Sequence, residues 1–139
     1  MALAMALLFS AAFFILGSSI FPTGEATTLY PITMTVYDTV TNKPNKTYST
    51  EVAYRGILIG AMQRAQQKYK NGFSFTTTYN LDYGPFLESV NGLKGSTAKH
   101  TYWQLLIKNK NGTVVIADVG IGCYIPDPED NIIFKFTKW

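Results

Sequence analysis

One amphipathic helix in a chain otherwise patterned for strands limits the possible fold more than any other feature of this sequence. Apolar side chains recur every three or four positions between residues 58 and 69, which places them on one face of a helix. They are Leu58, Met62, Ala65 and Tyr69. Asn71-Gly72 is expected to end the helix, because glycine tolerates a left-handed backbone. A sheet then has to bury the apolar face.

Alternation of apolar and polar residues predicts the strands around this helix. Two strands precede it, at residues 30–39 and 48–54. The later strands are expected at residues 73–79, 86–90, 102–108, 113–117 and 132–138. Asn91-Gly92 is typical of a tight turn, and the glycines of residues 119–125 indicate a bulged or irregular segment. This order predicts an α+β, β-grasp-like fold, with two antiparallel or mixed sheets around one helix.

The inward phase of these elements predicts the core. Large apolar side chains on the helix and on the inner faces of the strands should be largely buried together. They are Met62, Ala65, Phe75, Trp103, Leu105, Phe134 and Phe136.

Length and charge limit the function classes. A chain of 139 residues fits one domain, and its net charge of +3 comes from scattered lysines, which is not the footprint of a nucleic-acid-binding protein. The single cysteine, Cys123, excludes a disulfide within the chain. We expect Cys123 to be a small buried residue, and pairing with another chain is the alternative.

The N-terminal segment, residues 1–26, is set apart from the domain expected at residues 27–139. Residues 3–21 are almost wholly apolar and uncharged, and small residues follow them. This pattern is typical of a secretory signal peptide cleaved near Thr27, while a membrane anchor is the structural alternative. A segment that is retained would have to be buried, because water does not tolerate such a surface.

Two Asn-X-Thr tripeptides favour a secreted, extracellular protein. They begin at Asn45 and Asn111 and lie in turn-like stretches rich in asparagine, glycine and lysine, where glycosylation acceptors have to be.

Residues that could support catalysis are sparse. His100 has no neighbour in the sequence that would orient it as a base or a metal ligand, and no phosphate-binding glycine loop is present. We therefore predict no enzyme, no catalytic residue and no metal site. Asp127, Glu129 and Asp130 could bind calcium, but an acidic turn before the last strand is the preferred interpretation. Aromatic residues after position 80 could form either a stacking surface or part of the core.

A series of short motifs resembles one known family. The series comprises Phe73-Ser74-Phe75-Thr76, Tyr83-Gly84-Pro85-Phe86, Val90-Asn91-Gly92-Leu93, Tyr102-Trp103-Gln104-Leu105-Leu106, Gly120-Ile121-Gly122-Cys123-Tyr124 and Phe134-Lys135-Phe136. These motifs resemble the C-terminal domain of transcobalamin, intrinsic factor and haptocorrin, which also occurs as a DUF4430 module in extracellular proteins. The resemblance covers about residues 30–139 and implies a β-grasp-like fold.

The resemblance also implies a ligand-facing edge. In the cobalamin carriers this module closes over the corrinoid, while a large helical domain holds the other side. The matching positions here are Tyr83, Gly84, Pro85, Phe86, Tyr102 and Trp103. The 139 residues contain no large helical domain, and tight binding needs most of a ligand to be buried. We therefore expect no tightly held cofactor, and binding of cobalamin no tighter than about millimolar.

Two functional interpretations follow. In the first, the protein is an extracellular structural module that assembles with copies of itself into a filament or surface array, through its N-terminal segment and its sheet edges. The assembly residues would be Leu3, Leu7, Leu8, Phe9, Phe13, Phe14, Ile15, Leu16, Ile20 and Phe21. In the second, it is a secreted module that binds a small ligand, a corrinoid or a glycan. Neither involves nucleic acid, and a membrane is involved only through an uncleaved N-terminal segment.

Overall fold

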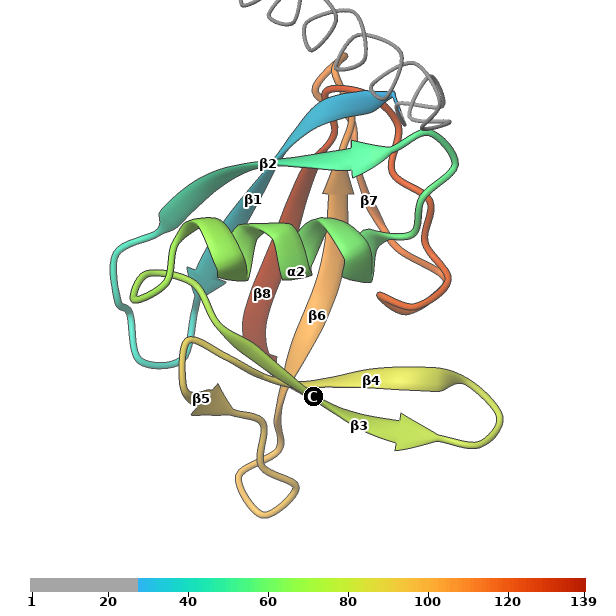
Figure 1. Cartoon of the computed structure of the whole chain (residues 1–139). Coiled ribbons are helices and arrows are strands. Elements are labelled where there is room, and N and C mark those ends of the chain that lie inside the picture. The colour runs from blue at the N-terminus through green and yellow to red at the C-terminus, as the bar shows by residue number, and fades with distance from the viewer. Residues whose placement is uncertain (1–27) are drawn as a thin grey trace, which may run out of the picture.

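The structure, a computed structural model, describes residues 28–139, and its centre is a five-stranded sheet of order β2-β1-β8-β6-β7 (Figure 1). Its strands are β1 (Leu29–Asp38), β2 (Lys46–Ala53), β6 (Thr101–Lys108), β7 (Val114–Ile116) and β8 (Asn131–Lys138). Within it β1 pairs with β8 in parallel, and the other pairs are antiparallel. The sheet is therefore mixed, as predicted.

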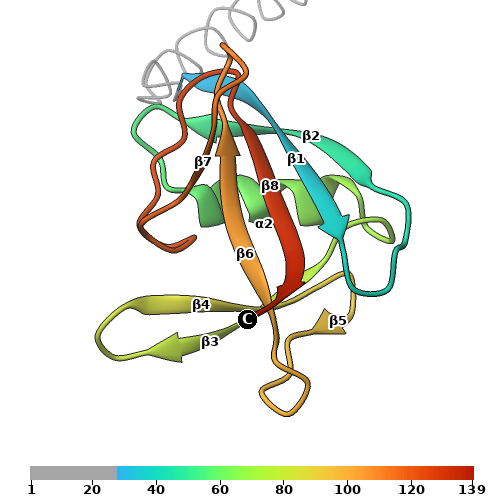
Figure 2. The ribbon, with the colours of Figure 1, turned by 180° about the vertical axis from the view of Figure 1, so that it is seen from behind.

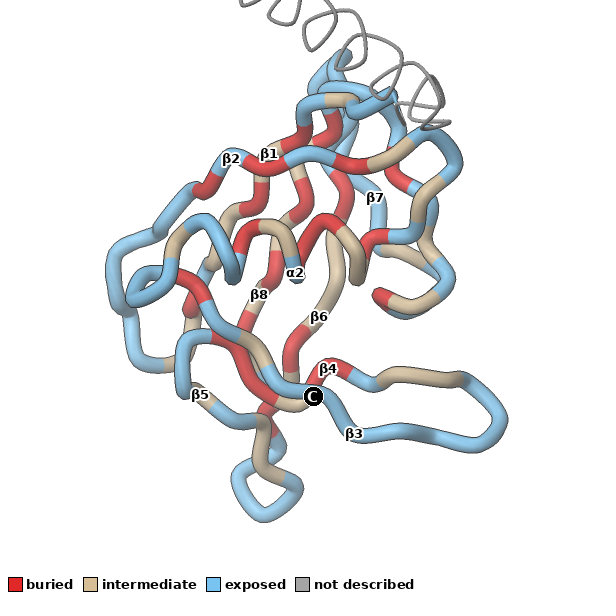
Figure 3. Tube along the Cα trace, in the orientation of Figure 1, coloured by how far each residue is buried: buried red, intermediate tan, exposed pale blue. Residues whose placement is uncertain are grey.

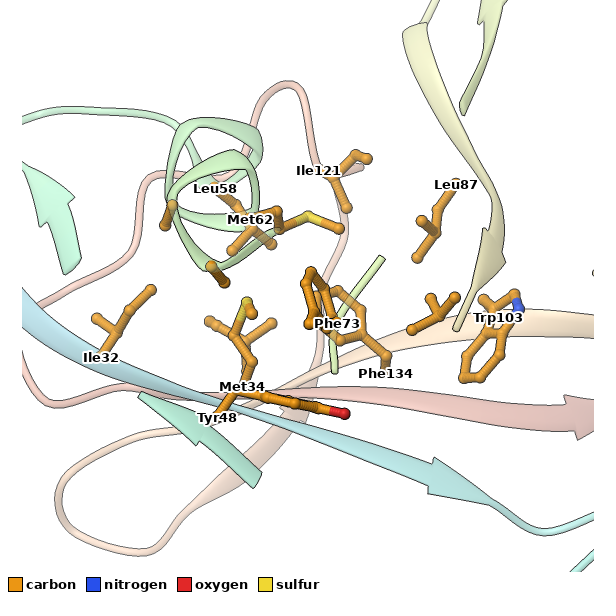
Figure 4. Packing of buried hydrophobic residues seen from close by; sticks show 14 of the residues in the cluster. Ile32, Met34, Tyr48, Leu58, Met62, Phe73, Leu87, Trp103, Ile121 and Phe134 are labelled. Atoms are coloured by element: carbon orange, nitrogen blue, oxygen red, sulfur yellow. The ribbon is translucent and has the colours of Figure 1, made fainter. Parts of the chain in front are cut away.

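The helix α2 (Leu58–Lys68) lies across one face of this sheet (Figure 1). Its buried residues are Leu58, Ala61, Met62 and Ala65, the stripe that the helical period predicts. Figure 4 shows Leu58 and Met62 on the side of the helix that faces Ile32 and Met34 of the sheet, with Phe73 beside Phe134. Within the described residues, the predicted combination of one helix with two sheets is confirmed.

The predicted core is largely confirmed. Met62, Ala65 and Phe134 are completely buried, and Trp103 and Phe136 are buried with their ring centroids 4.8 Å apart. Phe75 and Leu105 are half-buried at the margin of the core. Phe75 is the first residue of a strand whose other five residues are exposed, and its ring lies 6.1 Å from that of Phe73.

Neither end of α2 is closed by the usual local signal, a capping side chain at the start or a left-handed glycine at the end. No side chain caps its N-terminus; instead the N–H groups of Leu58 and Ile59 donate to the carbonyls of Tyr124 (2.8 Å) and Ile121 (3.0 Å). At the other end, Gly72 donates its N–H to the Tyr69 carbonyl (2.8 Å) but does not adopt a left-handed backbone. The proposed left-handed role of Gly72 is wrong, because the helix already ends at Lys68.

A second sheet, of order β3-β4-β5, leaves the body of the domain as an arm (Figures 1 and 2). Its strands are β3 (Phe75–Asn80), β4 (Gly84–Val90) and the two-residue β5 (Leu93–Lys94). Asn91 and Gly92, with φ angles of 50° and 80°, form the tight turn that the sequence predicts between β4 and β5. The strand β5 was not predicted, because it has only two residues and they lie at the start of a polar loop.

The segment from Val119 to Ile125 forms turns rather than a strand, as its glycines indicate. Ile121 is buried and holds this segment against the core. None of the helices in residues 28–139 has the length and apolar character needed to cross a bilayer.

Candidate ligand-binding groove

A groove of about 820 Å³ lies between the β3–β4 hairpin and the loop of residues 117–123, which we call the groove loop. The hairpin contributes Thr78, Tyr79, Asn80, Leu81, Asp82, Tyr83, Gly84, Pro85 and Phe86, and the groove loop contributes Ala117, Asp118, Val119, Gly120, Gly122 and Cys123. Its volume is within the range of small-molecule sites. The two walls come from segments far apart in the sequence.

The groove loop is held in place from two sides. Carbonyls in and just after it accept the first N–H groups of α2, as described above. On the other side, Gly122 lies so close to the hairpin that a Cβ atom there would be 2.7 Å from Pro85 Cδ. A side chain at this position would overlap the proline ring, so glycine permits the close approach of the two walls.

Hydrogen bonds between a side chain and the backbone fix the tip of the hairpin. The Asn80 side-chain oxygen accepts N–H groups from Asp82 (2.9 Å) and Tyr83 (3.0 Å), which is the local bonding that asparagine provides in turns. Gly84 follows with a φ of 76°, a conformation that favours glycine. Between the strands, the hydroxyls of Thr76 and Ser89 lie 2.6 Å apart.

The ordered hairpin presents apolar side chains to solvent. Leu81 is 91 % exposed, Tyr83 81 % and Phe86 58 %. Clustered exposure of this kind, on one side of a groove, is typical of an interaction site. The flat rings could stack on a planar ligand.

The six residues of the predicted ligand-facing edge do not form one surface. Tyr83, Gly84, Pro85 and Phe86 line the groove. Trp103 is buried in the core instead, and its indole N–H donates to the Leu93 carbonyl (2.8 Å).

Tyr102 is half-buried and its ring lies 5.9 Å from that of Trp139. It lines a separate hollow of about 140 Å³ that Trp103 also borders and that shares only Phe86 with the groove. The alternation along β6 places Trp103 in the core cluster and leaves Tyr102 outside it.

Cys123 corrects another prediction. It is exposed and lines the groove, rather than being a small core residue. The buried position belongs to Ile121, two residues earlier, because the loop turns its isoleucine inward and its thiol outward. Sequence reasoning assigned no site role to the groove loop, although Gly120 and Gly122 signal a close backbone approach.

The remaining candidates are structural or exposed. Asp130 is buried and accepts hydrogen bonds from the Tyr124 hydroxyl (2.7 Å) and the Asp127 N–H (2.9 Å). Burial, together with the hydrogen bond to Asp130, raises the pKa of Tyr124. Within residues 28–139 no group of three acidic, histidine or cysteine side chains is placed to hold a metal ion. Its two hydrogen bonds and its burial give Asp130 a structural part in the acidic turn.

His100 is exposed and its ring lies 5.2 Å from that of Trp139, edge to face. Asn45 and Asn111 are both exposed, as glycosylation acceptors require, and their modification stays a prediction. The predicted assembly residues, within residues 3–21, all lie outside the described residues.

Comparison with known proteins gives one family match. Residues 57–138 match the family described as "Domain of unknown function (DUF4430)". Human Transcobalamin-1 is 27 % identical over an alignment of 97 residues that covers 68 % of this chain and 21 % of that protein. The chain therefore spans about a fifth of the length of this curated relative.

Two solved structures share the fold. Haptocorrin in complex with Cbi superposes with a TM-score of 0.68 at 20 % identity, over 81 % of this chain and 26 % of that one. A putative metal binding protein from Ruminococcus gnavus ATCC 29149 superposes with a TM-score of 0.56 at 13 % identity, over 79 % of this chain and 98 % of that one.

Proposed function

Because this chain belongs to the DUF4430 family and its domain is of the transcobalamin C-terminal type, we propose that it is a ligand-binding module rather than an enzyme. The ligand is a corrinoid, and the groove between the β3–β4 hairpin and the groove loop is its site. The relatives support this choice: haptocorrin is known in complex with Cbi.

One observation carries the proposal. The motif Tyr83-Gly84-Pro85-Phe86, which the resemblance places at the corrinoid-facing edge, lines the groove and exposes two aromatic rings to it. An exposed ring has most of its face free to lie against a flat macrocycle, and burial of that face on binding is favourable. The glycine and proline between the rings bring the backbone close to the ligand.

The groove is open to solvent on one side, which sets the expected affinity. Drug-sized ligands bind tightly when 70–90 % or so of their surface is buried, and a corrinoid that lies in this groove keeps one face in water. We expect these residues alone to bind with a dissociation constant of about 1 mM, which corresponds to about 4 kcal/mol. A second domain or protein that covers the open face would strengthen binding.

We also propose that the module acts outside the cell. The support is the apolar character of residues 3–21 and the exposed positions of Asn45 and Asn111. Mass spectrometry of the protein from its natural source, before and after removal of N-linked sugars, would test this. An unmodified protein that begins at Met1 would contradict it.

Cys123 makes a direct binding experiment possible. It is the one cysteine of the chain and lines the groove, so the rate at which iodoacetamide alkylates it reports on occupancy of this site. A corrinoid should slow alkylation in a saturable way, and calorimetry should give the same dissociation constant. Trp103 fluorescence is a poor probe, because the ring is buried away from the groove.

Matched variants locate the site. Tyr83→Ala and Phe86→Ala should each weaken binding about tenfold, since each removes a stacking ring. Tyr54→Ala is the control, because Tyr54 is 61 % exposed but does not line the groove. Cys123→Ser, followed by calorimetry, separates stacking from ligation of the corrinoid metal by the thiol. Equal loss in all variants, or no protection of Cys123 at millimolar corrinoid, would contradict the proposal.

Self-assembly is a second candidate, favoured by the exposed edge of the arm. Five of the six residues of β3 are exposed, and β3 pairs on one side with β4. An unpaired strand edge can accept a strand from another copy. Light scattering on the full chain and on a chain that begins at Thr27 would test this candidate. If both chains are monomeric at high concentration, the result would contradict self-assembly.

A further inference from the structure

The charged residues that line the groove are both acidic. Asp82 lies in the tip of the hairpin and Asp118 in the groove loop, so each wall carries one carboxylate. Both are exposed. Among the described residues that line the groove there is no lysine, arginine or histidine. The groove is therefore negative, although the chain as a whole has a net charge of +3.

Neither carboxylate forms a salt bridge within the described residues. In residues 28–139 the one salt bridge joins Lys94 to Glu88 (2.6 Å), and neither of these lines the groove. The hydrogen bond that fixes Asp82 uses its backbone N–H, and leaves its side chain available. Like charges that line a concave surface add their potentials over the space between them, and attract ligands of opposite sign.

We propose that this negative groove selects a flat ligand that carries positive charge or many amide N–H donors, and rejects an anionic one. The inference rests on the proposed function and specifies its ligand class: among corrinoids, the preferred ones lack a phosphate-bearing tail or free carboxylates. The aromatic rings support the same choice, because the face of an aromatic ring attracts a cation. Carboxylate oxygens accept strong hydrogen bonds from amide groups.

A phosphate in the groove would have no cationic partner. Anion sites in proteins use arginine, lysine or clustered backbone N–H groups, and the lining residues include no arginine and no lysine. An anionic ligand would instead meet two carboxylates, one on each side. This repulsion weakens with added salt, because both carboxylates are exposed.

Two corrinoids of opposite charge test the inference. Aquacyanocobinamide carries a net positive charge and amide side chains, while cobyrinic acid carries the same ring with carboxylates in place of the amides. At low salt we expect the first to bind about tenfold more tightly than the second, with a difference that shrinks as sodium chloride approaches about 1 M. Alkylation of Cys123 and calorimetry both measure this difference.

An isosteric double variant, Asp82→Asn with Asp118→Asn, assigns the preference to these two side chains. It should reduce the preference to about twofold or less. Glu51→Gln is the control for net charge, because Glu51 is exposed on β2 and does not line the groove. It should leave the preference unchanged.

The outcomes are distinguishable. Failure of both corrinoids to bind would overturn the proposed function itself. Equal binding of the two, tighter binding of cobyrinic acid, or a preference that survives the double variant would overturn this inference and leave corrinoid binding standing.

Discussion

The helix-covered sheet and the β3–β4 arm use apolar side chains in opposite ways. Beneath α2 the residues of the core are almost completely buried, as in the case of Met34 and Phe134. On the arm, Leu81 and Tyr83 are almost completely exposed. Figure 3 shows the change from buried to exposed along the chain as it passes from the body into the hairpin.

The difference indicates what holds each region. The body is stabilised by burial of apolar surface, which is the main favourable term in folding. The arm is shaped by strand pairing, by the Asn80 turn and by its contact with Gly122. An isolated two-stranded hairpin is marginal in water, so the anchoring at its base matters more than its exposed side chains. We therefore expect stability and binding to be separable by mutation.

The largest effect should come from the core. Phe134→Ala removes a completely buried ring that lies 6.3 Å from the ring of Phe73, and should lower the free energy of unfolding by about 3–5 kcal/mol. Urea denaturation followed by circular dichroism measures this. A loss below about 1 kcal/mol would show that the body does not depend on burial as we describe.

The next largest loss of stability should come from the hydrogen bond between Tyr124 and the buried Asp130. Tyr124→Phe removes a hydroxyl that donates to this carboxylate and should cost about 1.5–3 kcal/mol near neutral pH. Because the folded state raises the pKa of Tyr124 above its ordinary value of 10.0, the folded state holds this proton more tightly. The stabilisation is complete below about pH 10 and is lost as the pH rises further.

Unfolding experiments at several pH values test the sign of this effect. From about pH 9.5 upward, the stability of the unmodified protein should fall more steeply than that of Tyr124→Phe. The other tyrosines are shared by the two proteins and contribute equally to both profiles. Parallel profiles would contradict the assignment.

A smaller effect is expected at the junction between the two regions. Gly122→Ala forces a methyl group against Pro85 and should cost about 1–3 kcal/mol, the usual range for overpacking. It should also displace the hairpin and weaken corrinoid binding. Gly120→Ala is the control in the same loop, because a Cβ atom at this position would lie 3.8 Å from its nearest neighbour, the Pro85 carbonyl oxygen, which is an ordinary contact distance. If both alanines behave alike, the close approach at Gly122 does not set the groove.

The smallest effect should come from the tip of the arm. Leu81→Ser changes a side chain that is 91 % exposed and should alter the free energy of unfolding by less than about 0.5 kcal/mol. Binding should weaken if Leu81 contacts the ligand. A large loss of stability would mean that the arm folds back onto the body in solution.

Periodicity was enough to predict the body of the fold. The spacing in α2 and the alternation in β8 identify the inward faces directly, because a buried face repeats with the period of its element. Only the hairpin side of the groove could be predicted from the sequence. Tyr83 and Phe86 lie in a recognisable motif, but their partner wall comes from a distant loop with no period of its own. The motif series put Trp103 at the ligand-facing edge, whereas the alternation along β6 put it in the core, and the structure agrees with the alternation.

The parallel pairing of β1 with β8 has a consequence for how the domain is made. These strands are the centre of the main sheet, yet the Asn131 side chain that bonds to Thr33 lies 98 residues further along the chain. Until β8 has left the ribosome, β1–β2 and β6–β7 remain separate hairpins with exposed apolar faces. Closure is then a late event that depends on long-range contacts, which makes folding slow. A premature stop before residue 131 would yield two unjoined halves prone to aggregation rather than a smaller working domain.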